Sequence, residues 1–285
     1  MKIMKRKENR IFTIQAGNIF IFLSLIISVP VMAAGENFPV GTRPASMANT
    51  YVMHSDIWSV YHNQAGLGFY PHFSLGFHHE NKFVIPEYSL HAVAVTLPVK
   101  PGTFGLSYSY FGYEKYNESK IGLGFGKSFG EKFSAGVQTN LHHVYIEGEF
   151  ENRNAITVEG GIQYRPTDKF SLGVHLFNPS RAKISPYNSD TLTTTLRAGT
   201  SYHPLEKLLI ACEVEKHIDR KPVFKAGIEY QLIESLYLRT GLFTNPVQNT
   251  FGIGYKIKMI SADIAFTHHQ ILGFTPHFSL QVKFN

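Results

Sequence analysis

The chain has 285 residues, of which 44% are hydrophobic, 14% aromatic and 17% charged, and its formal net charge is +6. The mean hydropathy is nevertheless only −0.09, which is typical of transmembrane strands, whose two faces meet lipid and lumen and so carry apolar and polar residues in alternation. The single cysteine, Cys212, excludes an internal disulfide framework.

Residues 1–33 have the composition of a secretory signal peptide. An apolar run from Ile19 to Val29 is followed by Ala33 and Ala34. The run is preceded by the cations Lys2, Lys5, Arg6, Lys7 and Arg10. This order predicts a cleavable export signal. A membrane-anchoring helix is the alternative, but the run is shorter than the roughly 20 residues that a spanning helix needs. The five cations less Glu8 carry +4 of the +6, which leaves the mature chain near +2 and gives no indication of a nucleic-acid partner.

Residues 34–70 differ in kind from the rest of the mature chain, because they show no strand-like alternation. They combine polar residues such as Arg43, His54, Asp56 and Asn63 with several Met, Trp and Tyr residues. A disordered N-terminal extension is one interpretation, and the apolar and aromatic content argues against it. We therefore expect a structured segment at 34–70, followed by one domain at 71–285.

From residue 71 onward, apolar and polar residues alternate with a period of two. Phe104, Leu106 and Tyr108, for example, alternate with Gly105 and Ser107. The alternating stretches end in short polar turns, such as 129–132, 166–169 and 204–207, and restart at once. A soluble β-sandwich or lipocalin-like barrel would also alternate, but fourteen sequential strands are too many for one such core.

The pattern predicts an all-β protein, a transmembrane antiparallel up-and-down β-barrel of about 14 strands with a short N-terminal plug. Its strands are expected near 72–79, 88–98, 103–111, 119–128, 132–146, 154–165, 169–177, 191–203, 207–216, 222–231, 235–243, 249–257, 261–269 and 275–284. An even count puts both termini on one side, so the short connections would face the periplasm and longer ones, such as 178–190, the exterior. The expected location is the bacterial outer membrane, with outer-membrane lipid around the barrel.

The last strand supports this location. Phe278, Leu280, Val282 and Phe284 share one face of it, and an aromatic residue near the C-terminus resembles the signal by which outer-membrane barrels are recognised for assembly. Asn285 follows the aromatic residue here, which departs slightly from the usual pattern.

Charged residues of both signs are predicted to face the lumen on neighbouring strands. These are Glu159, Arg197, Glu213, Glu215, Lys225, Glu229, Arg239 and Asp263. Opposite charges on adjacent strands can form cross-strand pairs. A polar conduit is one interpretation of the set. We favour a charge-laced interior that fills or braces a narrow barrel, because neither sign dominates to give ion selectivity.

The segment from Gly41 to Leu67 carries a motif: Gly-small-Arg, then Met, then an acidic residue, then an Asn-x-Ala-Gly-Leu sequence. The residues that match are Gly41, Arg43, Met47, Asp56, Asn63, Ala65, Gly66 and Leu67. This resembles the N-terminal signature of the outer-membrane family that includes PorV and PorQ of the type IX secretion system, and more distantly the FadL-type transporters of long-chain fatty acids. Gln64 stands where that family usually has proline. The resemblance implies that the segment enters the lumen as a plug.

Two roles are implied by the resemblance, and both are without catalysis. A PorV/PorQ-like accessory of protein secretion or surface assembly would dock secretion-machinery proteins and needs no wide pore. A FadL-like transporter would carry a hydrophobic small molecule, and needs an apolar pocket within the lumen or at a lateral opening. We expect the first role, because the predicted lumen is polar and the chain is short for a fatty-acid carrier.

An enzymatic alternative comes from two His-x-Ser sequences, His72 with Ser74 and His277 with Ser279, in the first and last strands. Outer-membrane acyl hydrolases place such a pair on the face that meets lipid, whereas here the alternation turns both pairs inward. The sequence also shows no orienting Asn or Asp beside them. We therefore predict no catalytic residues.

No cofactor or metal site is predicted either. The adjacent histidines at 78–79, 142–143 and 268–269 cannot readily hold one ion between them, because neighbouring residues on a strand point to opposite faces. Phosphate-binding loops, zinc-ligand spacings and dinucleotide fingerprints are absent from the sequence.

Overall fold

A computed structural model describes residues 37–148, 153–184 and 191–284. The signal peptide predicted at 1–33 lies outside these residues. Within them no helix is long and apolar enough to cross a membrane.

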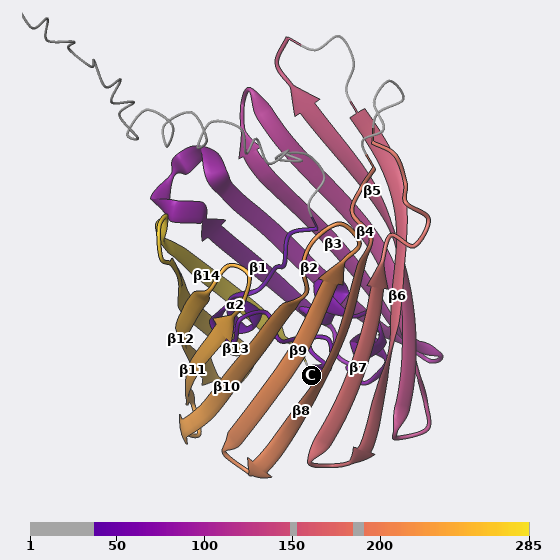
Figure 1. Cartoon of the computed structure of the whole chain (residues 1–285). Coiled ribbons are helices and arrows are strands. Elements are labelled where there is room, and N and C mark those ends of the chain that lie inside the picture. The colour runs from indigo at the N-terminus through magenta and orange to yellow at the C-terminus, as the bar shows by residue number, and fades with distance from the viewer. Residues whose placement is uncertain (1–36, 149–152, 185–190, 285) are drawn as a thin grey trace, which may run out of the picture. The chain divides into compact units, whose positions relative to one another are not determined.

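Fourteen antiparallel strands form a closed barrel in which each strand pairs with its sequence neighbours and β1 pairs with β14 (Figure 1). The strands are β1 (Ser74–Asn81), β2 (Ser89–Val99), β3 (Gly102–Tyr113), β4 (Tyr116–Phe129), β5 (Phe133–Ile146), β6 (Arg153–Thr167), β7 (Phe170–Phe177), β8 (Thr195–Leu205), β9 (Leu208–His217), β10 (Val223–Ile233), β11 (Leu236–Phe243), β12 (Gln248–Ile257), β13 (Ile260–His269) and β14 (Gly273–Lys283). The predicted fold class and the strand number are confirmed. The largest differences from the predicted bounds lie at the start of β8, four residues later than expected, and at the start of β4, three residues earlier.

The alternation of residues separates two faces of every strand. On β4 and β5, Leu123 and Val137 are 60% and 61% exposed on the outer face, whereas Gln138 and Asn140 are buried in the lumen. An apolar outer face of this extent is stable only against lipid, because soluble proteins rarely expose such large apolar surfaces.

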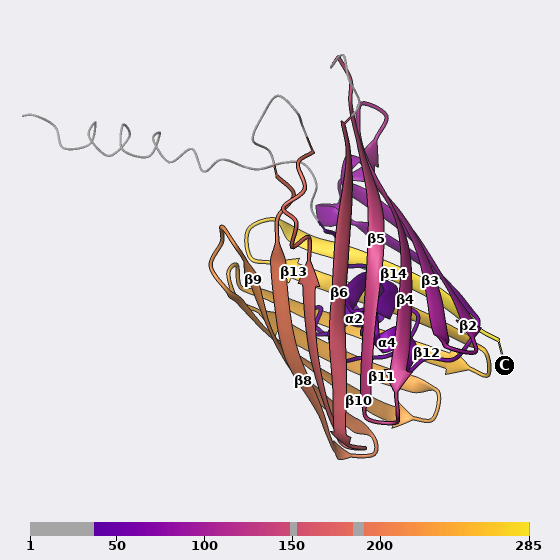
Figure 2. The same cartoon turned by 90° about the vertical axis from the view of Figure 1, so that its right-hand side faces the viewer.

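The two ends of the barrel differ in their connections. Short turns join β2 to β3, β6 to β7 and β12 to β13 at one end, which we call the turn end. The other end, the loop end, carries the two 3₁₀ turns η1 (Lys82–Val84) and η2 (Pro86–Tyr88) and the connection from β7 to β8. The topology prediction places the turn end in the periplasm. Strands β4 to β6 are the longest and rise above their neighbours at the loop end (Figures 1 and 2).

The segment before β1 lies inside the barrel and forms three single-turn helices, α2 (Thr42–Ser46), α3 (Ser59–His62) and α4 (Ala65–Gly68) (Figure 2). Its Tyr51, Trp58 and Tyr61 are the largest fully buried side chains among the described residues. Two hydrophobic clusters of the described residues therefore lie between this segment and the strands. A further cluster, around Val144 and Leu192, lies at β5, β6 and the connection from β7 to β8. We call residues 37–72 the plug.

Glycines let the plug backbone approach the barrel wall. A Cβ on Gly173 would lie 2.1 Å from the carbonyl oxygen of Val52, and one on Gly136 would lie 2.3 Å from the carbonyl carbon of Gln64. Both contacts are with backbone atoms, which cannot rotate away. The absence of a side chain at these positions is therefore required for the plug backbone to lie this close to the wall.

We expect Gly173→Ala to displace the plug and to lower the unfolding temperature by several degrees, because overpacking against backbone typically costs about 1–3 kcal/mol. The matched control is Gly76→Ala, also on the lumen face, where the new Cβ meets only side-chain atoms of Ile57 and Trp58 at 3.1 Å. The check is thermal unfolding in detergent together with the rate of proteolysis within the plug. Equal effects of the two substitutions would contradict the close-approach argument.

Candidate functional site: a plugged lumen with a cavity on each side

Arg43 is the central ionic contact between plug and barrel. Its guanidinium donates two parallel hydrogen bonds to Glu229 on β10, Nε to Oε2 and Nη2 to Oε1, each at 2.8 Å. The remaining nitrogen, Nη1, lies 3.1 Å from both the Tyr51 hydroxyl and Asp56 Oδ2, and the Tyr51 hydroxyl donates to the same carboxylate. This paired geometry is the one in which an arginine–carboxylate contact is strongest and most directional.

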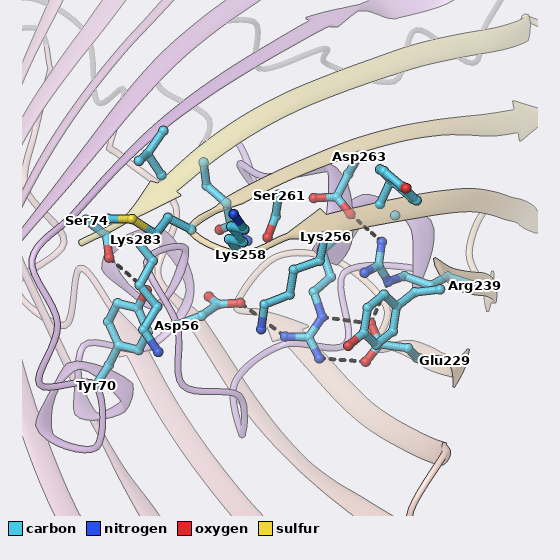
Figure 3. A pocket seen from close by; sticks show the side chains of 17 residues that line it. Asp56, Tyr70, Ser74, Glu229, Arg239, Lys256, Lys258, Ser261, Asp263 and Lys283 are labelled. Carbon is cyan, nitrogen blue, oxygen red and sulfur yellow. Dashed lines mark hydrogen bonds and ion pairs between the residues drawn. The ribbon is translucent and has the colours of Figure 1, made fainter. Parts of the chain in front are cut away.

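The network continues from strand to strand along the inner face of the barrel wall. Arg239 on β11 donates to Glu229 at 2.5 Å and to Asp263 on β13 at 2.6 Å. Positive and negative groups therefore alternate from Asp56 through Arg43, Glu229 and Arg239 to Asp263 (Figure 3). Each buried charge has an opposite partner, which compensates its removal from water.

A second carboxylate holds the plug by its backbone. Glu213 on β9 accepts hydrogen bonds from the amides of Tyr51 and Val52 through Oε2, at 2.8 and 3.1 Å. Lys225 on β10 lies 3.6 Å from Glu213 and 2.7 Å from Glu215. Glu213 thus satisfies two amides of a stretch that has no regular secondary structure.

Arg197 on β8 contacts the second helix of the plug, α3. It donates to the carbonyl oxygen of His62 at 2.5 Å and lies 3.1 Å from Nδ1 of His175 on β7, whose Nε2 is 3.0 Å from Glu159. Burial, and then the neighbouring Arg197, lower the pKa of His62 well below its ordinary value. His62 is therefore neutral, and it donates from Nε2 to the carbonyl oxygen of Val40 at 2.8 Å.

All eight predicted lumen charges thus lie on the lumen face, and seven of them contact the plug or one another. Glu159 is the eighth and pairs with His175. Uncharged partners that the sequence analysis did not single out complete the set: Gln138 and Asn140 on β5 donate to Glu159 at 3.0 and 2.8 Å. The sequence feature that could have identified Gln138 and Asn140 is the alternation of β5, which places them on the same inward face as Ser134.

Asn63 holds together two strands and the plug. Its Nδ2 lies 2.7 Å from the carbonyl oxygen of Val52 and 3.2 and 3.3 Å from those of Ile162 and Val174, which are paired in β6 and β7. Its Oδ1 accepts from the amide of Ala65 at 3.1 Å. The two N–H groups of one amide are thus shared among three carbonyl oxygens, and its oxygen accepts from one N–H group.

We expect Asn63→Asp to destabilise the plug more than Asn63→Ala does. A carboxylate has no donor to offer the three carbonyl oxygens, and a buried ion facing them costs more than a missing side chain. The measurement is thermal unfolding of both variants. The control is Asn117→Asp, at the loop end of β4 and away from the plug. If Asn63→Asp were as stable as the wild type, Asn63 would not have the clamping role.

The other motif residues are packing elements of the plug. Gly41 lies against Trp58, Met47 against Gly227, and Leu67 against Gly105. The carbonyl oxygen of Ala65 accepts from Ser134 on β5 at 2.6 Å. A Cβ on Gly66 would lie 2.4 Å from the Ser59 hydroxyl.

The two His-x-Ser sequences are engaged in other contacts. Ser74 hydrogen-bonds with Tyr70 at 2.8 Å, and Ser279 lies 3.5 Å from Asp263. His277 hydrogen-bonds with Thr267 at 3.0 Å. His72 lies before β1 and is not part of a strand.

Two cavities lie on opposite sides of the plug. The turn-end cavity has a volume of about 290 Å³ and is lined by Arg43, Glu229, Arg239 and Asp263 together with Lys256 and Lys258 (Figure 3). The loop-end cavity has a volume of about 480 Å³. Its lining mixes the polar Arg197, Glu215 and Lys225 with the apolar Pro39, Tyr61, Val223, Phe243 and Pro246.

The residues of one strand show what separates the cavities. On the lumen face of β10, Lys225 lines the loop-end cavity and Glu229 the turn-end cavity. Gly227 lies between them, and a Cβ added there would lie within 2.8 Å of atoms of Met47 and Thr50. The stretch Met47–Thr50 therefore forms the barrier between the cavities at this strand.

The fold is shared with solved outer-membrane channels. No protein-family model and no curated protein sequence matches the chain. The CymD monoaromatic hydrocarbon channel is 12% identical with a TM-score of 0.65, covering 88% of this chain and 99% of its own. The toluene transporter TbuX of Ralstonia pickettii is 12% identical with a TM-score of 0.66, covering 86% and 98%. A FadL homologue of Pseudomonas aeruginosa is 11% identical with a TM-score of 0.57, covering 88% and 99%. The chain has the fold of these outer-membrane β-barrels, in agreement with the predicted location.

Proposed function

We propose that this protein carries small hydrophobic compounds across the outer membrane, and that the stretch Met47–Thr50 is the barrier to their passage. The observation that carries the proposal is the pair of cavities separated by this stretch at Gly227. The solved channels of the same fold, a monoaromatic hydrocarbon channel and a toluene transporter, support the chemical class. This is the FadL-like alternative of the sequence analysis.

The loop-end cavity is the proposed entry site. Its volume of about 480 Å³ lies within the roughly 300–1,000 Å³ range of small-molecule sites, and the side chains of Tyr61, Val223 and Phe243 provide apolar contact. A polar rim with an apolar patch can admit a hydrophobic compound from water without retaining it tightly.

Passage requires the barrier to move, and few polar contacts hold it. Thr250 on β12 donates to the carbonyl oxygen of Ser46 at 2.8 Å, and its hydroxyl lies 3.2 Å from the amide of Ala48. Glu213 holds the following residues, Tyr51 and Val52. A shift of 46–52 breaks these contacts together with those of Asn63 to Val52 and of Arg43 to Tyr51. The contacts of Arg43 with Glu229 and of Asn63 with the two strand carbonyls continue to anchor the rest of the plug.

Native mass spectrometry of the mature protein, extracted in mild detergent from its own outer membrane, tests the proposal. We expect a monomer that carries a defined hydrophobic ligand, displaced by added toluene. A protein without any hydrophobic ligand that also fails to bind toluene would contradict the proposal.

The second candidate is the PorV/PorQ-like accessory role in protein secretion or surface assembly. The observation that favours it is the extent to which plug and ion pairs fill the lumen, since docking partner proteins needs no pore. In the same experiment it predicts specific co-purifying proteins. It also predicts that deletion of the gene changes the set of secreted and surface-attached proteins, and an unchanged set would count against it.

A further inference from the structure

Three buried side chains meet at the seam where the barrel closes. His78 and Glu80 are two residues apart on β1 and so share its lumen face, and His277 on β14 is paired with Glu80. The exposed fractions of the three side chains are between 1% and 8%. We call them the seam cluster. In the sequence, His78 is a candidate metal ligand only together with the adjacent His79, whose side chain points to the opposite face.

The distances within the seam cluster are long for hydrogen bonds. His277 Nδ1 lies 3.4 Å and His78 Nε2 3.9 Å from Glu80 Oε2, and the three possible ligand atoms all lie within 4.8 Å of one another. Strong hydrogen bonds to carboxylates span about 2.7–2.9 Å. Two ligands held about 2.1 Å from one tetrahedral ion are instead separated by about 3.4 Å. The spacing thus fits an ion between the three groups after a small closure of the site.

The two nitrogens that face Glu80 are buried, and neither has a hydrogen-bond partner within the described part of the chain. The other nitrogen of each ring is engaged. His78 Nδ1 lies 3.2 Å from the Thr42 hydroxyl of the plug, and His277 Nε2 lies 3.0 Å from the Thr267 hydroxyl on β13. An outer hydrogen bond on the distal nitrogen is the usual way in which a metal-binding histidine is oriented and its tautomer fixed.

The charge of Glu80 also points to a cation at this place. A buried carboxylate is stable only with a compensating positive group. Lys82, the nearest lysine in the sequence, acts on Glu80 only from a distance. Its ammonium group lies 4.4 Å from the centre of the Phe38 ring and forms no direct ion pair with Glu80, both residues being among those described. A divalent ion held by two neutral histidines and Glu80 would provide the compensation.

We propose that the seam cluster binds one divalent transition-metal ion of the Zn²⁺ type. Two imidazoles and one carboxylate form a common three-residue ligand set for such ions, with further positions left to water or another ligand. The ion joins the first strand of the barrel to the last and, through Thr42, fixes the start of α2. The site is independent of the transport proposal, because its residues line neither cavity.

The test is zinc binding by the full mature protein in detergent, stripped with a chelator and then dialysed against Zn²⁺. We expect one Zn²⁺ per chain by elemental analysis and an unfolding temperature several degrees higher with Zn²⁺ than without. Glu80→Gln, which keeps the shape of the side chain, and His78→Ala should each lose the bound zinc and the temperature shift. Thr267→Val should weaken zinc affinity about tenfold, since it removes the outer hydrogen bond of His277.

His79→Ala is the matched control, because this neighbouring ring stacks on His91, with centroids 4.7 Å apart, on the opposite face of β1. It should bind zinc like the wild type. Folding of every variant is verified by the different gel migration of unheated and heated samples. Binding of Co²⁺ to the wild type, read from its visible absorption, reports the ligand set without any substitution. The proposal is overturned if the stripped wild-type protein takes up no stoichiometric metal, or if Glu80→Gln and His78→Ala retain it.

Discussion

Replacing Arg43 with alanine is expected to release the plug from the barrel wall. The substitution leaves the partly buried Asp56 without its cation and removes two of the hydrogen bonds of Glu229. Breaking a fully buried ion pair by removing one partner typically costs about 3–5 kcal/mol, which is an upper limit for these partly buried side chains. We therefore expect a large fall in the unfolding temperature and rapid proteolysis within residues 41–67.

The control for Arg43→Ala is Lys256→Ala, which removes a cation from the lining of the same cavity at an exposed position. It should leave both readouts near those of the wild type. Arg43→Lys should fall between the two, because an ammonium retains the charge without the paired hydrogen bonds. If Arg43→Ala matched Lys256→Ala, the ionic network would not be what holds the plug.

Replacing Glu213 with alanine is expected to open the barrier. It leaves the amides of Tyr51 and Val52 unpaired in a buried site, at a cost of about 1–3 kcal/mol each. Lys225 keeps Glu215 as a partner, so the barrel wall itself should stay folded. We expect faster entry of hydrophobic compounds and a new leak of small polar solutes, measured by uptake into intact cells.

Glu213→Gln is the matched control for that experiment. Its side-chain oxygen can still accept from the two amides, so we expect a smaller leak than for alanine. If the two substitutions were equal, the charge of Glu213 and not its hydrogen bonds to the plug would control the barrier. If neither changed the leak, the barrier would lie elsewhere.

The strands were predictable from the sequence because each face of a transmembrane strand meets one medium throughout. The period-two pattern therefore records both the existence of a strand and its orientation, as at Leu123 and Val137. The predicted start of β8 was wrong because the alternation continues through Thr191–Thr194, where only an isolated bridge between Lys183 and Thr191 forms. The alternation alone cannot distinguish a residue that is paired with a neighbouring strand from one that lies just before the strand begins.

The contacts of the plug were less predictable, because they depend on depth and register that no local pattern records. Of the polar residues Arg43, His54, Asp56 and Asn63 that set this segment apart in the sequence, Arg43 meets an inward charge of the barrel, at Glu229. Asn63 instead contacts backbone carbonyl oxygens. The seam cluster was missed because its third member, His277, lies almost two hundred residues after His78, and only barrel closure brings them together.

Uptake of radiolabelled toluene by intact cells tests the central claim most directly. Cells that lack the gene are compared with cells that express the wild type or Glu213→Ala, with a labelled sugar as the polar control. We predict that toluene enters several-fold faster with the wild type than without it, while sugar entry is unchanged, and that Glu213→Ala accelerates both. Equal rates of toluene entry with and without the wild-type protein would contradict the account.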